Sequence, residues 1–249
     1  MNEFIEKVEW DSIFFNLNIY RTFLEKINQE HIEKINNMQK TICIDLIYHF
    51  QNSNYIKNVQ LLESNNFYLT QQKIELILDL FDYGKNMLDV KNSNVILFDD
   101  RKHNIEDLYK ISNQISVNSR FYNDKHFCKS KVEELYKFWV YNSYYGKFAD
   151  KIYVYNKDKN IYGFCIIQIE NNDIIRISLI GVDQTRERKG IGSIILKKVL
   201  IDYKGKGYKK CLVATQANNV NALNFYIKHN FRIYKSELVF HKWFERRRE

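Results

Sequence analysis

The stretch that decides the fold is Ile175-Arg-Ile-Ser-Leu-Ile-Gly-Val182 followed by Asp183-Gln-Thr-Arg-Glu-Arg-Lys-Gly-Ile-Gly-Ser193. The apolar run predicts a strand, and the apolar spacing after the second segment predicts a helix. The glycine-bearing loop between them allows a ligand to approach the backbone closely, because glycine has no side chain. The first amides of a helix lack intrahelical partners and lie at the positive end of its dipole. The stretch therefore predicts a phosphate-binding loop from Arg186 to Ser193.

Two glycines alone are weak evidence, and the competing interpretation is a tight strand-to-helix turn with solvated charges. The loop is not a dinucleotide-binding fingerprint, because Ile195 stands where the third glycine would be. It is not a Walker loop either, because no Gly-Lys-Ser/Thr sequence follows. The residues around the loop must therefore decide between these interpretations.

The flanking sequence predicts alternating strands and helices, which is typical of an α/β protein. We expect strands at 19–24, 41–50, 67–80, 95–98, 151–156, 161–170, 173–182 and 209–215, with one or two more within 231–243. We expect helices at 28–39, 53–64, 105–117, 130–145, 190–203 and 219–229. The polar segment 83–94 predicts a domain boundary. The prediction is a small α/β domain over residues 1–92, followed by a second domain over 93–249.

The loop and the helix after it resemble the GNAT superfamily of N-acetyltransferases. Glu187-x-x-Gly190-x-Gly192 is similar to the family's coenzyme A motif, Gln/Arg-x-x-Gly-x-Gly/Ala, with Glu187 in place of the usual residue. Asn219, Ala222 and Tyr226 match a second family element in spacing. The resemblance implies a GNAT fold over residues 93–249: a mixed, mostly antiparallel sheet with two splayed strands, flanked by helices.

The resemblance also implies acetyl-coenzyme A as cosubstrate, with no metal, and attack of an amine on the thioester. The residues expected to contact the coenzyme are Ile180, Val182, Arg188, Lys189, Gly190, Ile191, Gly192, Ser193 and Asn219. Tyr226 is expected to protonate the leaving thiolate, since a phenol is acidic enough to do so. The alternatives are that Tyr226 packs on the sheet and that Asn219 is a helix N-cap. Glu170, His229 and His241 are the candidate general bases, although a structural role is favoured for each.

A narrower resemblance concerns the acceptor. Val8-Glu-Trp-Asp-Ser-Ile-Phe-Phe-Asn-Leu-Asn-Ile-Tyr20 is similar to the opening of bacterial nucleotide amino-sugar acetyltransferases of the TDP-fucosamine type, as is Ser119-Arg-Phe-Tyr122. It implies acetylation of the amino group of a nucleotide-linked amino sugar, such as a dTDP-4-amino-4,6-dideoxyhexose, for bacterial surface polysaccharide synthesis. Arg120 and Tyr122 are the expected substrate contacts, against the alternative of a solvated arginine and a packed aromatic side chain. Trp10, Phe14 and Phe15 are expected in the core.

Composition narrows the class further. The formal charge is +8, which suits a phosphorylated ligand, a nucleic acid or an acidic membrane. No nucleic-acid-binding motif and no apolar run of membrane length is present, so neither partner is expected, and the cytoplasm is the expected location. The four cysteines are far apart and are expected to be small buried side chains of a reducing compartment. A homodimer, an acceptor that is a peptide, lysine or polyamine, and a non-catalytic coenzyme-binding module stay open.

Overall fold

The computed structural model describes residues 4–81, 83 and 94–245. The chain divides into two compact units. The first unit comprises residues 1–74, 216–218 and 236–249, and the second comprises residues 75–215 and 219–235. The predicted boundary after residue 92 lies outside the described residues. The first unit also includes the closing segment of the chain, residues 236–249, which the sequence interpretation assigned to the second domain.

The first unit is a small mixed sheet with helices. Its elements are β1 (Ile5–Lys7), α1 (Glu9–Phe15), β2 (Ile19–Thr22), α2 (Gln29–Ile42), β3 (Leu46–Asn52), α3 (Ile56–Ser64), the first part of β4 (Tyr68–Asp79) and the end of β10 (Arg232–Trp243). The strand order is β1-β2-β3-β10-β4, with β2 and β3 parallel and β3 and β10 antiparallel. Ile32, Ile35 and Leu62 of α2 and α3 pack into its core against Ile47 and Phe240 of the sheet.

The second unit holds the phosphate-loop sequence. Its elements are the end of β4, β5 (Val95–Leu97), α4 (Ile105–Ser116), α5 (Arg120–Asn123), α6 (Lys129–Tyr144), β6 (Lys151–Lys157), β7 (Asn160–Asn171), β8 (Ile174–Val182), the 3-10 helix η1 (Gln184–Arg186), α7 (Ile191–Gly205), β9 (Lys210–Gln216), α8 (Val220–Lys228) and the start of β10. The strand order is β4-β9-β8-β7-β6-β5. β8 and β9 are parallel, whereas β5 to β8 are antiparallel in sequence order.

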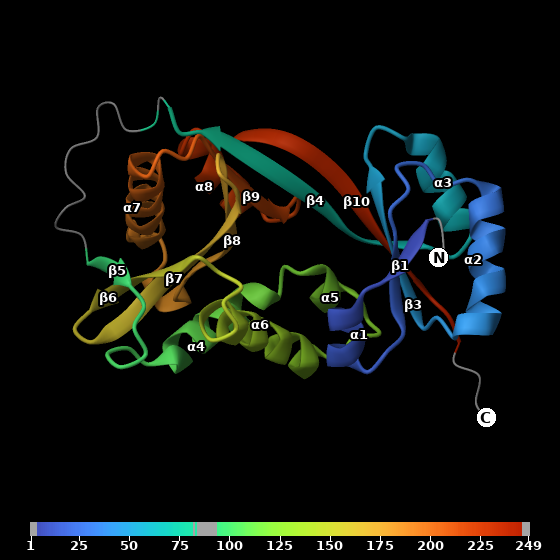
Figure 1. The fold of residues 1–249 in the computed structure, drawn as a ribbon, viewed down its shortest axis with the longest axis horizontal. Helices are drawn as coiled ribbons and strands as arrows, with labels where there is room; N and C mark the ends of the chain where they lie inside the picture. Colours follow the sequence, from blue (N-terminus) through green and yellow to red (C-terminus); the bar gives the residue numbers. More distant parts are fainter. Residues whose placement is uncertain (1–3, 82, 84–93, 246–249) are drawn as a thin grey trace. The chain divides into compact units, whose positions relative to one another are not determined.

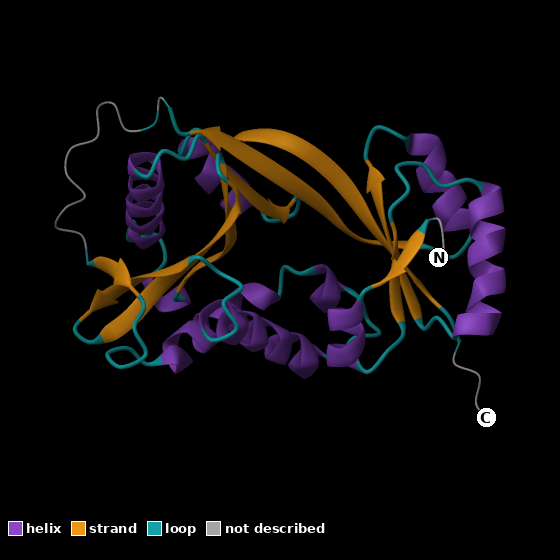
Figure 2. Ribbon diagram, in the orientation of Figure 1, coloured by secondary structure: helices purple, strands orange, loops and turns teal. Residues whose placement is uncertain are grey.

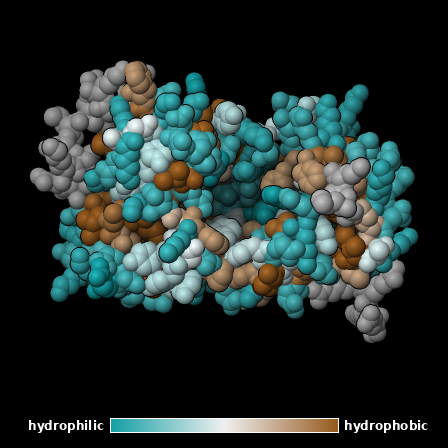
Figure 3. Space-filling view, viewed as in Figure 1, coloured by the Kyte–Doolittle hydropathy of each residue, from teal (hydrophilic) through white to brown (hydrophobic). Residues whose placement is uncertain are grey.

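Helices cover both faces of this second sheet (Figures 1 and 2). A side chain at Gly181 would meet Ile111 of α4 at 2.8 Å, so Gly181 faces α4. Gly163 of β7 is paired with Val182, the residue after Gly181. A side chain at Gly163 would meet Ile195 of α7 at 2.9 Å, so Gly163 faces α7. We call these two surfaces the α4 face and the α7 face. Apolar residues of α4, α6 and β6–β7 form the core on the α4 face. The outer surface of the protein in the view of Figure 3 is mainly hydrophilic.

The parallel pair β8 and β9 separates partway along its length. The paired residues run from Ile174 and Lys210 to Ile177 and Val213, and the register of the described residues pairs nothing beyond them. The register of β8 against β7 also shifts between Ile177 and Leu179, which is a β-bulge at Ser178. Ser178 and Ala214, directly beyond the last pair, are exposed although both belong to interior strands. The two strands therefore diverge at this point, and an open space, which we call the splay, begins there.

Most predicted elements are present, and the differences have local causes. The strand expected at 41–50 begins only at Leu46, because α2 continues to Ile42 and ends at Cys43 in a left-handed conformation. Cys43 and Cys128 are exposed, so the expectation of buried cysteines is wrong for them and confirmed for Cys165 and Cys211.

The aromatic residues near the N-terminus also differ from the expectation. Trp10, Phe14 and Phe15 belong to the unpredicted α1 and are half-buried. Phe14 stacks on Trp10, and Phe15 meets Phe14 edge to face.

The closing segment is a single strand. Residues 231–243 were expected to form one or two strands, and they form β10 alone. One of the two neighbours of β10 in the sheet is β4, which comes from the N-terminal third of the chain and lies between β10 and β9. The sequence did not predict this insertion, because nothing local to β4 specifies its partners. No helix among the described residues is long and apolar enough to cross a membrane.

Candidate active site

The phosphate-loop sequence folds as predicted between β8 and α7. Gly190 is the N-cap of α7 with a φ of 80°, a left-handed conformation that only glycine adopts without strain. The first intrahelical bond runs from Ile194 N to Gly190 O, so the amides of Ile191, Gly192 and Ser193 have no partner within the helix. These amides and the positive end of the helix dipole form a site that fits a pyrophosphate.

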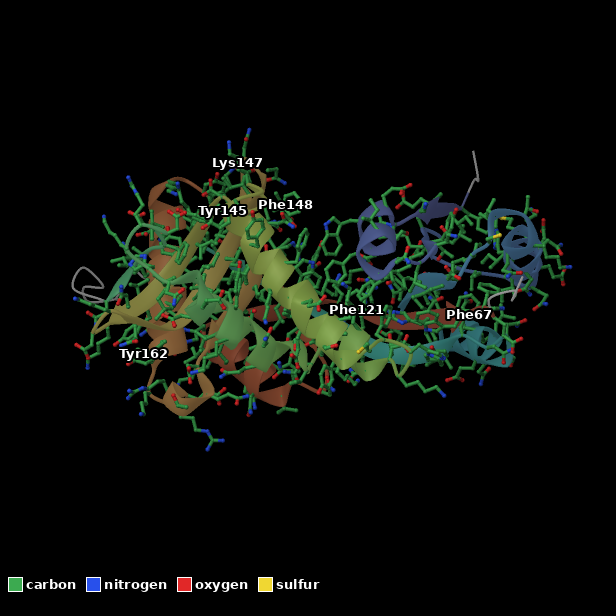
Figure 4. All side chains as sticks on the ribbon, turned by 90° about the horizontal axis from the view of Figure 1, so that it is seen from below. Phe67, Phe121, Tyr145, Lys147, Phe148 and Tyr162 are labelled. Atoms are coloured by element: carbon green, nitrogen blue, oxygen red, sulfur yellow. The ribbon has the colours of Figure 1, made fainter. Side chains whose placement is uncertain are left out.

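Contacts to neighbouring elements hold the start of this loop. Asp183 accepts hydrogen bonds from Thr185 N at 2.9 Å and from Thr185 Oγ1 at 2.7 Å, and it pairs with Lys110 of α4 at 3.0 Å. Burial alone would raise the pKa of Asp183, but these partners outweigh it and lower the pKa. The Arg186 guanidinium lies 4.7 Å from the centre of the Tyr162 ring (Figure 4). The loop is therefore fixed at its β8 end.

The charged part of the loop is open to solvent. Every residue from Gln184 to Gly190 is exposed, including Arg188 and Lys189. Arg188 has a φ of 59°, which is uncommon for a residue with a side chain and is typical of functional loops. Glu187, the residue out of the family pattern, is exposed between Arg186 and Arg188. Its charge is therefore screened by solvent and by two cations, and the amides remain available to an anion.

The splay lies next to this loop. Ile180 and Val182, two predicted coenzyme contacts, are half-buried on β8 beyond the last residue paired with β9. A side chain at Gly192 would touch Val182 and Phe225 at 3.5 Å, so the first turn of α7, the end of β8 and α8 meet at this point. The backbone edge of β8 beyond Ile177 is thus free to pair with an extended ligand whose phosphates lie in the loop.

Tyr226 lies on the α7 face where the splay begins. Its side chain is only 4% exposed and interacts electrostatically with Cys165 and Cys211. Those cysteines are paired with Ile180 and Ile175, so the tyrosine lies over the middle of β8. Burial, followed by these two thiols, raises the pKa of Tyr226 above its ordinary value. Its hydroxyl is therefore protonated at neutral pH, and it has no hydrogen-bond partner among the described residues.

The two ends of α8 carry two of the predicted site residues, Asn219 and His229. Asn219 is the N-cap of α8, and its side chain accepts from Ala222 N at 3.2 Å, which is the alternative role expected for it. His229 follows α8 and places Nε2 2.9 Å from Ser193 Oγ. Burial, then Lys197 and Lys228, lower the pKa of His229. A neutral His229 therefore fixes the Ser193 hydroxyl in the first turn of α7, a structural task that leaves it poorly suited as a base.

The two predicted acceptor contacts lie on α5. Arg120 lies 4.6 Å from the centre of the Phe121 ring, and Phe121 packs on Phe127 and on Trp139 of α6 (Figure 4). Tyr122 lies 4.0 Å below the Lys129 ammonium. These contacts explain how α5 is held against α6. The role of Arg120 and Tyr122 in binding a substrate stays a prediction.

A charged group on the α4 face was not predicted. Arg176 of β8 pairs with Glu75 of β4, its Nη1 2.7 Å from Oε1, and its Nε also contacts Glu170 of β7. Glu170, one of the candidate bases, is thus held in an ion pair. His241, another candidate, is fully buried on β10 of the first unit against the Tyr48 ring. The sequence feature that could have indicated the pair of Arg176 and Glu75 is that each is the single charged residue in an otherwise apolar run, Ile174–Val182 and Ile74–Leu78.

Comparisons with known proteins concern the family and the fold of this chain. The model of the family described as "Acetyltransferase (GNAT) family" matches residues 118–231. No curated protein matches the chain. A functionally unknown conserved protein from Staphylococcus epidermidis is 15% identical with a TM-score of 0.64, over 91% of this chain and 84% of that one. A GCN5-related N-acetyltransferase from Sphaerobacter thermophilus is 12% identical with a TM-score of 0.63, over 90% and 72%.

A third solved structure is a GCN5-related glucosamine N-acetyltransferase region of a fungal multi-domain protein. It is 13% identical with a TM-score of 0.59, and the alignment covers 95% of this chain and 30% of that one. At such identities these structures show the fold alone, and they confirm the predicted fold class. Residues 118–231 thus match the model of the GNAT acetyltransferase family, and the chain as a whole shares the fold of these solved structures.

Proposed function

We propose that this protein transfers the acetyl group of acetyl-coenzyme A to the amine of a nucleotide-linked amino sugar, such as a dTDP-4-amino-4,6-dideoxyhexose. The observation that carries the transferase assignment is the Tyr226 hydroxyl. The Tyr226 side chain is buried where β8 and β9 separate, and its hydroxyl is protonated and has no hydrogen-bond partner among the described residues. A proton donor in this position serves the sulfur of a thioester whose phosphates are held by the adjoining loop.

Each residue then has a definite task. The amides of Ile191 to Ser193 bind the pyrophosphate, with Arg188 and Lys189 beside it, and the free edge of β8 orients the pantetheine arm. The unprotonated amine attacks the thioester carbonyl carbon, the new C–N bond forms and the C–S bond breaks. Because burial raises the pKa of Tyr226, a hydrogen bond to the departing sulfur is favoured over complete ionisation of the phenol. The proton lost by the amine leaves to solvent.

The choice of acceptor rests on the sequence. The segment Val8–Tyr20 and the segment Ser119–Tyr122 resemble nucleotide amino-sugar acetyltransferases, and the positive formal charge suits a diphosphate-bearing acceptor. The fungal region, a glucosamine N-acetyltransferase by name, shares the fold of this chain. An amino-sugar acceptor is therefore compatible with the architecture, and Arg120 and Tyr122 are its proposed contacts.

The test is acetyl-coenzyme A turnover against a panel of amines at equal concentration. The panel contains a dTDP-4-amino-4,6-dideoxyhexose, glucosamine, a peptide with a free N-terminus, a lysine peptide and spermidine. We expect the highest kcat/KM with the nucleotide sugar. Preferred acetylation of a peptide or of spermidine would contradict the proposed acceptor but keep the transferase. Binding of coenzyme A without turnover of any amine would instead identify a non-catalytic module.

A further inference from the structure

The Arg176 group lies at the splay, on the face opposite Tyr226. Arg176 is paired in register with Gln168 of β7 and Leu212 of β9, and it comes just before the last pair of β8 and β9. Along β7, Ile167 faces the same side as Gly163, which is the α7 face, because the two are an even number of residues apart. Gln168 and its partner Arg176 therefore face the opposite side from Ile167 and its partner Ile177. Arg176 therefore belongs to the α4 face. Tyr226 and Arg176 approach one end of the splay from its two sides.

Glu75 reaches the same place from β4. Backbone hydrogen bonds from Leu80 N to Lys209 O and from Ala217 N to Gln72 O define one antiparallel register of β4 and β9. This register places Glu75 opposite Ala214, the exposed residue directly beyond the last β8–β9 pair. A residue from outside the region matched by the family model thus reaches the open end of the splay.

The charged group of Glu75, Glu170 and Arg176 carries more negative than positive charge. Arg176 neutralises one of the two carboxylates, so one net negative charge remains at the splay. The Glu75 side chain is 12% exposed and Arg176 is 24% exposed, which excludes much of the solvent that would otherwise compensate the charge. Glu75 uses Oε1 for Arg176, and its Oε2 has no partner among the described residues. This oxygen is therefore open to a donor from a bound ligand, and an ammonium would form a charge-assisted hydrogen bond with it.

We propose that Glu75, held by Arg176, binds the ammonium form of the acceptor, which makes Glu75 the specificity-determining residue for a cationic amine. This inference rests on the proposed acetyl transfer and specifies how its acceptor is recognised. An ammonium has three donors and bonds well to a carboxylate. Glu75 would bind the protonated amine from solution next to the thioester, and the ammonium releases its extra proton to solvent before the neutral amine attacks. Glu170 supplies the second carboxylate that keeps Arg176 fixed.

The experiment measures the acceptor KM and the acetyl-coenzyme A KM of Glu75→Gln, using the dTDP-4-amino-4,6-dideoxyhexose and, in parallel, glucosamine. We expect the acceptor KM to rise about tenfold below the pKa of the amine, as the loss of one partly buried charged hydrogen bond predicts. The acetyl-coenzyme A KM should stay within about twofold, since Glu75 lies away from the phosphate loop. Above the pKa of the amine, the ratio of the acceptor KM of Glu75→Gln to that of the wild type should approach one, since the neutral amine makes no ion pair.

Asp173→Asn is the matched control, because Asp173 directly precedes β8 and forms an exposed ion pair with Lys209, apart from the Arg176 group. It should change neither KM. If Glu75→Gln does not fold, Glu170→Gln removes one negative charge from the same group. Because Glu170 is more exposed, the acceptor KM should rise less than in Glu75→Gln, with the same pH dependence.

Two results are distinguishable. An acceptor KM ratio that is one, or that is the same at every pH, in an enzyme that turns over the amine would overturn the role of Glu75 and leave the transferase intact. Absence of turnover with every amine would overturn the proposed function, and this inference with it.

Discussion

The two faces of β8 at the splay are built differently. On the α7 face the loop, Ser193, Tyr226 and His229 come from one stretch of about forty residues, and the hydrogen bond between His229 and Ser193 joins its two ends. On the α4 face the charged group takes Glu75 from β4, Glu170 from β7 and Arg176 from β8. The donor side is therefore local in sequence and the proposed acceptor side is not. The first was open to sequence analysis, and the second became visible only from the strand order.

Tyr226→Phe gives the largest expected effect and tests the donor side. Removing the hydroxyl should lower kcat by about 100-fold, the lower end of general acid contributions, with both KM values nearly unchanged. Thermal stability should not fall, since the hydroxyl has no partner among the described residues. The control is Tyr203→Phe, whose hydroxyl is 2.6 Å from Asp150 Oδ2. This control should lower Tm and leave kcat alone. A kcat for Tyr226→Phe close to that of the wild type would remove Tyr226 from the mechanism.

The second prediction separates the two glycines of the loop. Gly190→Ala forces a side chain into a left-handed conformation, which costs about 1 kcal/mol or more, and should raise the acetyl-coenzyme A KM about tenfold. Gly192→Ala meets Phe225 and Val182 only at ordinary contact distance and should change this KM much less. Neither should alter the acceptor KM. Isothermal titration with coenzyme A checks the result, and equal losses in both variants would contradict the assigned conformations.

The third prediction concerns the acidic residue out of pattern. Glu187→Gln should lower the acetyl-coenzyme A KM about two- to fivefold, because it removes an exposed negative charge beside the bound phosphates. The gain should shrink at high ionic strength, as expected for exposed charges. Glu134→Gln on α6 removes an equally exposed carboxylate far along the chain and should have no such effect. A higher KM in Glu187→Gln would show that Glu187 binds the ligand.

The smallest expected effect is a pH dependence on the donor side. His229 has a pKa lowered by burial and then by Lys197 and Lys228. Below about pH 6.5 the unfolded chain binds this proton first, so the free energy of unfolding falls as the pH decreases through that range. Urea unfolding at about pH 7.5 and about pH 5.5, on either side of the ordinary histidine pKa, should show a smaller fall in His229→Gln, which keeps a partner for Ser193. The remaining fall includes His49, whose pKa burial also lowers. An unchanged pH dependence would mean that His229 contributes nothing to it.

What the sequence predicted follows this same division. The strand and helix series of the second unit and the loop were predicted, because periodicity and glycine positions act over a few residues. Asn219 was expected to bind the coenzyme or to cap α8, and the structure places it as the cap. The insertion of β4, the single closing strand and the pairing of Glu75 with Arg176 were not predicted. Each depends on which strands lie side by side, and only the complete fold determines that.

The insertion of β4 also has a consequence for biosynthesis. β4 emerges from the ribosome early, whereas its neighbours β9 and β10 follow more than 120 residues later. Until then both edges of a twelve-residue strand that includes Ile74, Leu76 and Leu78 lack their final partners. Pairings of such long sequence separation form slowly, and exposed strand edges invite association with other chains. The nascent chain therefore carries an unpaired apolar strand over this interval, and a fragment starting at residue 93 would leave β9 with the same unprotected edge.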